Sequence, residues 1–118
     1  MMKEMIFKWK IFVCDLNPVY GSEQRGRRPV IVISDEDFNQ VMPVVTILPI
    51  TSLKEGRKVY PNEVLLKKWT GGLSQDSIIL VHQIRTISKI RLKESIGIVD
   101  DYNIQESINE ALRIHLNL

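Results

Sequence analysis

Short apolar segments rich in β-branched residues recur along the chain, and polar or glycine-containing turns separate them. Such segments are typical of β-strands. The pattern predicts strands at residues 11–15, 29–33, 43–50, 63–66, 77–84 and 95–99. The first strand carries apolar residues on both sides, so we expect both faces of the sheet to be covered. Residues 51–57 are expected to form a polar, basic loop after the third strand.

Two helices are expected beside these strands. The segment 34–40 begins with Ser34 and Asp35 and is typical of a short capped helix or turn. Near the carboxyl end, Asp100-Asp101 signals the start of a longer helix, and Asn103 followed by Glu106 resembles a capping box. Apolar residues then recur at helical spacing, at Ile104, Ile108, Ala111, Leu112 and Leu116. This stripe predicts an amphipathic helix packed on the sheet.

The order of these elements predicts the fold class. Several short strands followed by one helix favour a mainly β fold with helices, in the form of a small curled barrel with a carboxyl-terminal helix. The chain has 118 residues, which suits a single domain spanning residues 1–118. Its composition, 44% hydrophobic and 25% charged, is that of a globular domain with its own core. The net charge of +2 permits a nucleic-acid partner without arguing for one.

Composition also bears on location and cofactors. The one cysteine, Cys14, excludes an internal disulfide and favours a reducing compartment. No apolar run approaches the roughly 20 residues of a membrane span, and the charged amino terminus is unlike a signal peptide. We therefore expect a cytoplasmic protein that does not associate with membranes. His82, His115 and Cys14 lack the spacing of metal ligands, so neither a metal nor a cofactor is expected.

Polar side chains gather in two segments that adjoin apolar strands. The first runs from Gly21 to Pro29 and holds three arginines in four residues. The second is Pro49-Ile-Thr51-Ser52, where two hydroxyls follow a buried strand. Each segment is compatible with a solvated turn. Each also suits phosphate binding, because a guanidinium held beside a strand can match two phosphate oxygens.

A family resemblance favours the second interpretation. The segment from Asp15 to Ser34, with Gly21-Ser-Glu-Gln-Arg-Gly-Arg-Arg28-Pro29 at its centre, resembles the amino-terminal motif of the MazF/PemK toxins. Pro49-Ile-Thr51-Ser52 resembles the second motif of that family. Gln83-Ile-Arg-Thr-Ile-Ser-Lys resembles the third. The order and spacing of the three motifs agree with the family from about Lys10 to the carboxyl terminus.

The resemblance implies a fold, an activity and partners. It implies an SH3-like barrel with added helix and a homodimer that binds single-stranded RNA in grooves at the dimer interface. It also implies metal-independent endoribonuclease activity that leaves a 2′,3′-cyclic phosphate and a 5′-hydroxyl. A cognate MazE-like antitoxin would block the groove. Base preference in this family depends on variable loops, which correspond here to residues 19–27 and 53–60.

Individual site residues follow from the same motifs. The family's catalytic arginine and threonine correspond to Arg28 and Thr51. Further positions in or near the RNA groove correspond to Glu23, Gln24, Ser52, His82 and Gln83. The chemistry is consistent, because the substrate's own 2′-OH attacks and the enzyme need only orient the phosphate and stabilise its charge. An arginine gives up its proton only above pH 12, so we expect Arg28 to stabilise charge rather than transfer a proton.

Two positions depart from the family pattern. Trp9-Lys10 replaces the usual Gly-Asp before the first strand, away from the chemistry. His82 stands where the family usually carries an acidic residue, for which a catalytic part has been proposed in some relatives. A histidine there could carry a proton near neutral pH or could be a polar residue at the end of a strand.

Two other functions are compatible with such a chain. Some toxins of the same fold poison DNA gyrase without cleaving nucleic acid, but they depend on a tail similar to Trp-Gly-Ile, which Leu116-Asn-Leu118 does not match. A catalytically silent RNA-binding module would normally carry stacking aromatic residues. The aromatic content is only 7%, which disfavours that module.

Overall fold

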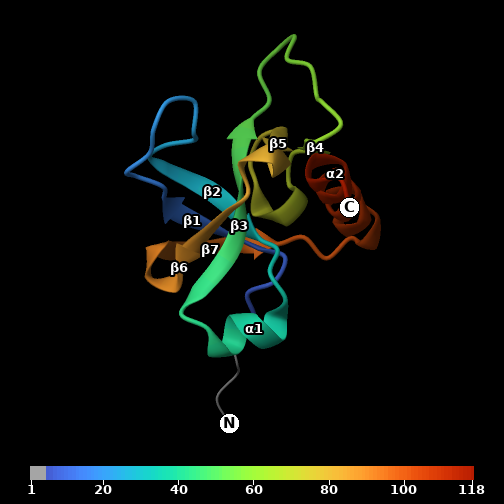
Figure 1. The fold of residues 1–118 in the computed structure, drawn as a ribbon. Coiled ribbons are helices and arrows are strands. Elements are labelled where there is room, and N and C mark those ends of the chain that lie inside the picture. Colours follow the sequence, from blue (N-terminus) through green and yellow to red (C-terminus); the bar gives the residue numbers. More distant parts are fainter. Residues whose placement is uncertain (1–4) are drawn as a thin grey trace.

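The computed structural model describes residues 5–118. Antiparallel strands dominate the fold, as expected (Figure 1). The strands are β1 (Lys10–Asp15), β2 (Arg27–Val32), β3 (Val44–Ser52), β4 (Val64–Leu66), β5 (Ser77–Ile79), β6 (Arg85–Ser88) and β7 (Leu92–Ile98). The α-helices are α1 (Glu36–Val41) and α2 (Tyr102–Leu116), and three short 3-10 turns are η1 (Thr70–Gly72), η2 (Val81–Gln83) and η3 (Lys89–Arg91).

The sheet curls around β3, which lies at its centre (Figure 1). The strand order is β4-β5-β3-β2-β1-β7, and β6 pairs with β3 off this path. One half of β3 pairs with β6 through Val44–Ile47, and the other half pairs with β5 through Ile50–Ser52. The mainly β fold with a carboxyl-terminal helix is therefore confirmed. No ladder joins β4 to β7 in the described part of the chain, so hydrogen bonds do not close the predicted barrel.

Both faces of the central strands are covered, as the apolar runs predicted. One cluster includes Ile31, Leu48 and Ile50, and it packs under Ile108 and Ala111 of α2. A second cluster on the other face includes Cys14, Val30 and Ile47. Apolar residues are thus required at successive positions in β1, β2 and β3, which explains the apolar runs inside these strands.

Three local predictions were wrong. Residues 77–84 do not form one strand, because η2 interrupts the run between β5 and β6. Thr51 and Ser52 do not begin a loop, because they continue β3 and pair with Ile78 and Ser77 of β5. The expected capping box is also absent. Asp101 is the N-cap of α2, and its carboxylate accepts hydrogen bonds from the backbone N–H groups of Asn103 and Ile104.

Within residues 5–118, no helix is long and apolar enough to cross a membrane.

Candidate functional site

The antiparallel pairing of β2 with β3 explains how two distant sequence motifs meet. The ladder aligns Val30 with Pro49 and ends there. Extending the same register by two residues sets Arg28 opposite Thr51. Both residues line one cavity of about 290 Å³, together with Ser52. The two predicted catalytic residues therefore lie together at one end of the sheet.

The Arg28 side chain is exposed and has one hydrogen bond. Its Nε donates to the carbonyl oxygen of Arg25 at 3.1 Å. The two terminal amino groups have no hydrogen-bond partner within residues 5–118. Holding Nε fixes the direction of the guanidinium and leaves its outer edge available for an anion. The sequence pattern predicted that the strand begins at Pro29, directly after Arg28. In the structure β2 begins at Arg27, so Arg28 lies inside the strand.

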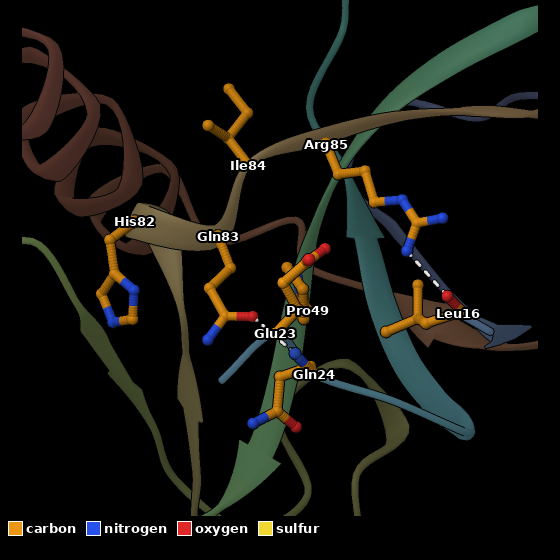
Figure 2. Close-up of a pocket in the computed structure, with 8 residues that line it drawn as sticks. All are labelled: Leu16, Glu23, Gln24, Pro49, His82, Gln83, Ile84 and Arg85. Carbon is orange, nitrogen blue, oxygen red and sulfur yellow. Dashed lines mark hydrogen bonds between the residues drawn. The ribbon is translucent and has the colours of Figure 1, made fainter. Parts of the chain in front are cut away.

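Four of the predicted groove residues, Glu23, Gln24, His82 and Gln83, line a neighbouring depression (Figure 2). This cavity of about 250 Å³ is lined by Leu16, Glu23, Gln24, Pro49, His82, Gln83, Ile84 and Arg85. The Gln83 side chain points toward Gln24 and accepts a hydrogen bond from its backbone N–H at 2.7 Å. The Glu23 carboxylate accepts from the backbone N–H of Tyr20 at 3.0 Å. The loop between β1 and β2 is thus held by residues predicted to contact RNA.

A third cavity joins the first two. Its volume is about 440 Å³, and it shares Thr51 and Ser52 with the first cavity and Gln24, His82 and Gln83 with the second. All seven residues predicted from the sequence therefore border one connected surface. The interruption at η2 contributes to this surface, because it takes His82 and Gln83 out of the strand ladder.

The structure adds Arg85 to this surface. Its guanidinium donates through one terminal nitrogen to the carbonyl oxygen of Leu16 at 2.8 Å (Figure 2). This contact joins β6 to the residue that follows β1. Arg85 belongs to the third sequence motif, but the sequence alone did not identify it as a groove residue. Its position in the lining of the cavity does.

A buried carboxylate, Glu63, was not predicted and lies beside the groove. Its side chain is 2% exposed. The carboxylate accepts hydrogen bonds from both terminal nitrogens of Arg57, at 2.7 and 2.8 Å. It also lies 2.8 Å from Nε2 of His82 and accepts from the backbone N–H of Tyr60 at 3.0 Å. Glu63 therefore fixes both the loop after β3 and the histidine of η2. A lone acid at the start of an apolar strand gave no signal of these partners.

The Glu63 cluster is strongly polarised. The hydrogen bonds from Arg57, with a further one from His82, lower the pKa of Glu63 to about 2 against the opposing effect of burial. The same ion pair raises the pKa of Arg57. The carboxylate is therefore charged at any pH near neutrality, and it holds Arg57 and His82 at the wall of the third cavity.

Other candidate chemistry receives less support. Cys14 is fully buried in the core, and burial raises the pKa of its thiol, which disfavours a nucleophilic thiolate. Within residues 5–118, no three histidine, cysteine, aspartate or glutamate residues cluster as metal ligands would. The acidic run at Asp35–Asp37 begins α1, where the Asp35 carboxylate caps the helix as expected of a surface cap.

The fold and the site together define a structural class. The protein is a small curled antiparallel sheet with a polar groove in which an arginine edge and a threonine hydroxyl face the same space. The family model described as "PemK-like, MazF-like toxin of type II toxin-antitoxin system" matches residues 8–116. The chain belongs to this family. The family predicted from the sequence motifs is therefore confirmed.

Individual relatives agree with this assignment. The endoribonuclease MazF of Staphylococcus saprophyticus is 39% identical over 114 residues, covering 97% of this chain and 93% of the relative. The crystal structure of MazF from Deinococcus radiodurans has a TM-score of 0.80 and 25% identity, covering 98% of this chain and 100% of that one. A mycobacterial endoribonuclease in complex with its cognate antitoxin shares the fold, with a TM-score of 0.77, 22% identity and 95% of each chain covered.

Proposed function

We propose that the chain is an endoribonuclease toxin that cleaves single-stranded RNA by attack of a 2′-OH on the adjacent phosphate. The observation that carries this proposal is the convergence of Arg28 and Thr51 on one cavity at the shared end of β2 and β3. The chain's membership in the MazF-like family, with a 39% identical relative named an endoribonuclease, supports the reaction class.

Arg28 and Thr51 have separate tasks in this mechanism. The 2′-oxygen forms a bond to phosphorus while the bond from phosphorus to the 5′-oxygen breaks, which leaves a cyclic phosphate and a 5′-hydroxyl. Negative charge grows on the non-bridging oxygens, and the outer edge of Arg28 can stabilise it. The Thr51 hydroxyl can donate to one of those oxygens and align the phosphate for in-line attack. Neither task requires a metal ion.

The 2′-OH must lose a proton, and the 5′-oxygen must gain one. Arg28 is unsuited to either transfer because guanidinium stays protonated below about pH 12. His82 lines two cavities of the connected surface, and an imidazole ring can both accept and donate a proton. Glu23, Gln24, Ser52, His82 and Gln83 position the RNA through hydrogen bonds along this surface, and the pH dependence of cleavage tests whether His82 also transfers a proton.

The test uses one RNA oligonucleotide in two forms. The unmodified form should be cleaved equally well with and without EDTA. A form with a single 2′-deoxy sugar on the 5′ side of the scissile phosphate should bind but remain intact, because the nucleophile is missing. Cleavage of this modified form at the normal rate would disprove the mechanism. Loss of activity in EDTA, restored by added metal, would contradict the metal-independent route.

The proposed partners follow from the family and from the charge of the loops. We assign the toxin a homodimeric state, a cytoplasmic location and a MazE-like antitoxin with an acidic, partly unstructured segment. The basic side chains that motivate an acidic partner are Arg25, Arg27, Arg57, Lys58, Lys67 and Lys68. Arg57 already pairs with Glu63, and Arg27 lies 3.5 Å from Glu94, so the lysines contribute the larger uncompensated charge.

Antitoxin binding is expected to weaken as salt rises, because exposed charges are screened. The measurement is inhibition of RNA cleavage by the co-expressed antitoxin across a salt series. A partner that is basic, or one that leaves cleavage intact when bound, would contradict this part of the proposal.

A further inference from the structure

The cavity that holds Arg28 and Thr51 has a wall outside the two loops expected to set base preference. That wall is the segment Gly72–Gln75, which follows η1 and leads into β5. Ser74 and Gln75 of this segment line the same cavity of about 290 Å³ as Arg28, Thr51 and Ser52. Residues 19–27 and 53–60 contribute no lining residue to it. Under the proposed function, the Gly72–Gln75 segment therefore faces the nucleotide beside the reacting phosphate.

The Gly72–Gln75 segment is anchored at both ends. The backbone N–H of Trp69 donates to the carbonyl oxygen of Leu73 at 2.7 Å, and the Leu73 side chain is buried in the core. At Gly72, φ is +83°, and a Cβ would come within 2.4 Å of the backbone oxygen of Ile96. Only glycine fits this close approach to β7. The segment thus rests directly on the sheet.

Asp76 secures the other end. Its side chain accepts from the backbone N–H of Lys68 at 2.8 Å, and its carbonyl oxygen accepts from the backbone N–H of Leu53 at 2.9 Å. The second contact ties the segment to the residue directly after Ser52. The distance between the segment and the end of β3 is therefore fixed, and a fixed wall suits selection by shape and hydrogen bonding.

The chemistry of the wall fits a base better than a second phosphate. The hydroxyl of Ser74 and the amide of Gln75 are neutral groups that donate and accept, and Arg28 is the only cation among the lining residues. Both side chains are exposed, and neither has a side-chain hydrogen-bond partner within residues 5–118. Pro29 and Ile96, which are partly exposed, add apolar surface to the lining and suit the flat face of a base.

The size of the cavity limits its occupant. Small-molecule sites in proteins occupy roughly 300–1,000 Å³, and this cavity of about 290 Å³ lies just below that range. Taken alone it is a space for one nucleotide, and neighbouring nucleotides would lie in the cavities that connect with it. Since Arg28 and Thr51 lie in the same cavity, that nucleotide is one of the two joined by the scissile phosphate.

We propose that Ser74 and Gln75 determine base preference at a position directly flanking the cleaved bond, with Gln75 reading the edge of the base. This inference rests on the proposed function, because it takes Arg28 and Thr51 as the residues that hold the scissile phosphate. Every base edge offers donors and acceptors in its own order, and an amide that pairs with two of them discriminates between bases.

The experiment compares cleavage of a randomised RNA pool by the wild-type chain and by Gln75→Ala, Gln75→Glu and Ser74→Ala. Sequencing of the new 5′-hydroxyl ends gives the preference at each position around the cut. Gln75→Ala should reduce discrimination at one flanking position on the order of tenfold, mainly by slowing cleavage of the preferred sequence. Gln75→Glu offers only acceptors, so it should favour bases that present an amino group. Asn103→Ala, on the exposed start of α2, is the matched control.

Three outcomes would overturn the inference while wild-type cleavage is observed. The first is an unchanged preference in both Gln75 variants. The second is an equal loss of rate for all sequences. The third is a change confined to positions distant from the cut. If the wild-type chain cleaves no RNA, the proposed function fails instead, so the two failures are distinguishable.

Discussion

The outer edge of the Arg28 guanidinium carries N–H groups in one plane, and under the proposed mechanism this geometry leads to a specific mutational pattern. Arg28→Ala should slow cleavage on the order of 10²-fold or more, because a contact to developing charge is lost. Arg28→Lys should recover little, since an ammonium cannot reproduce the planar pair of donors. The measurement is single-turnover cleavage of one RNA oligonucleotide.

Thr51 provides the matched comparison for this prediction. Thr51→Ser retains the hydroxyl and should retain most activity, whereas Thr51→Ala should lose much of it. Full activity in Arg28→Ala would leave attack by the 2′-OH intact as a mechanism but would remove Arg28 from its centre. Equal effects of the serine and alanine replacements would assign Thr51 a packing role.

The Glu63 carboxylate holds Nε2 of His82, and the His82 side chain lines two of the three cavities. Nε2 is 2.8 Å from the Glu63 carboxylate, and the groups facing the ring also include Arg57 and His115, whose ring centroid is 6.4 Å away. If His82 transfers a proton, His82→Ala should flatten the pH dependence of the rate near neutrality. His115→Ala is the control. A mutant profile of unchanged height and shape would return His82 to a structural role.

Glu63 makes acid stability testable. Its pKa of about 2 lies below the value of 4.5 expected in the unfolded chain, chiefly through hydrogen bonding to Arg57. A lowered folded-state pKa stabilises the fold above pH 4.5, and this contribution disappears as pH falls from 4.5 toward 2. A shift of this size corresponds to on the order of 3 kcal/mol.

Glu63→Gln should therefore be less stable at neutral pH and should lose less stability than the wild type between pH 4.5 and 2. Denaturant melts at several pH values measure this directly. Glu110→Gln is the control, because its exposed pair with Arg113 should contribute little. Parallel stability curves for the wild type and Glu63→Gln would contradict the assigned role.

At the scale of elements, the apolar runs were sufficient to predict most strands and the helix α2, but not the break in the run at 77–84. Val81 is fully buried although it lies in η2. Burial demands the same apolar residue in a strand or in a turn, so hydrophobicity could not distinguish them. The break matters, because the chain leaves β3 after Leu80, whose backbone N–H still donates to Pro49, and pairs with β3 again from Arg85.

The candidate site shows the same division between local and long-range information. The motifs identified Arg28 and Thr51 through resemblance, but only the register of β2 on β3 explains why they meet. Glu63 lacked any motif, because its partners Arg57 and His82 lie 6 and 19 residues away in the sequence. Side-chain clusters of this kind depend on how loops close over the sheet, which periodicity does not encode.

At the scale of the whole molecule, large apolar side chains remain exposed on the single chain. Phe38 and Val41 of α1 are 64% and 77% exposed, and Ile90 of η3 is 83% exposed. Phe38 and Val41 lie three residues apart in α1 and so share one face of the helix. An exposed apolar patch can mark an interaction surface. Together with the family assignment, this exposure motivates the prediction of a homodimer in dilute solution.

Light scattering at micromolar concentration should give twice the chain mass of 13.7 kDa. Because association of two identical chains depends on concentration, dilution should shift the population toward the monomer and lower the thermal midpoint. Replacing Phe38 or Val41 with a charged residue should shift the same equilibrium if α1 lies in the interface, and leave it unchanged if another surface forms the contact. A constant mass of 13.7 kDa across the micromolar range would contradict the dimer itself.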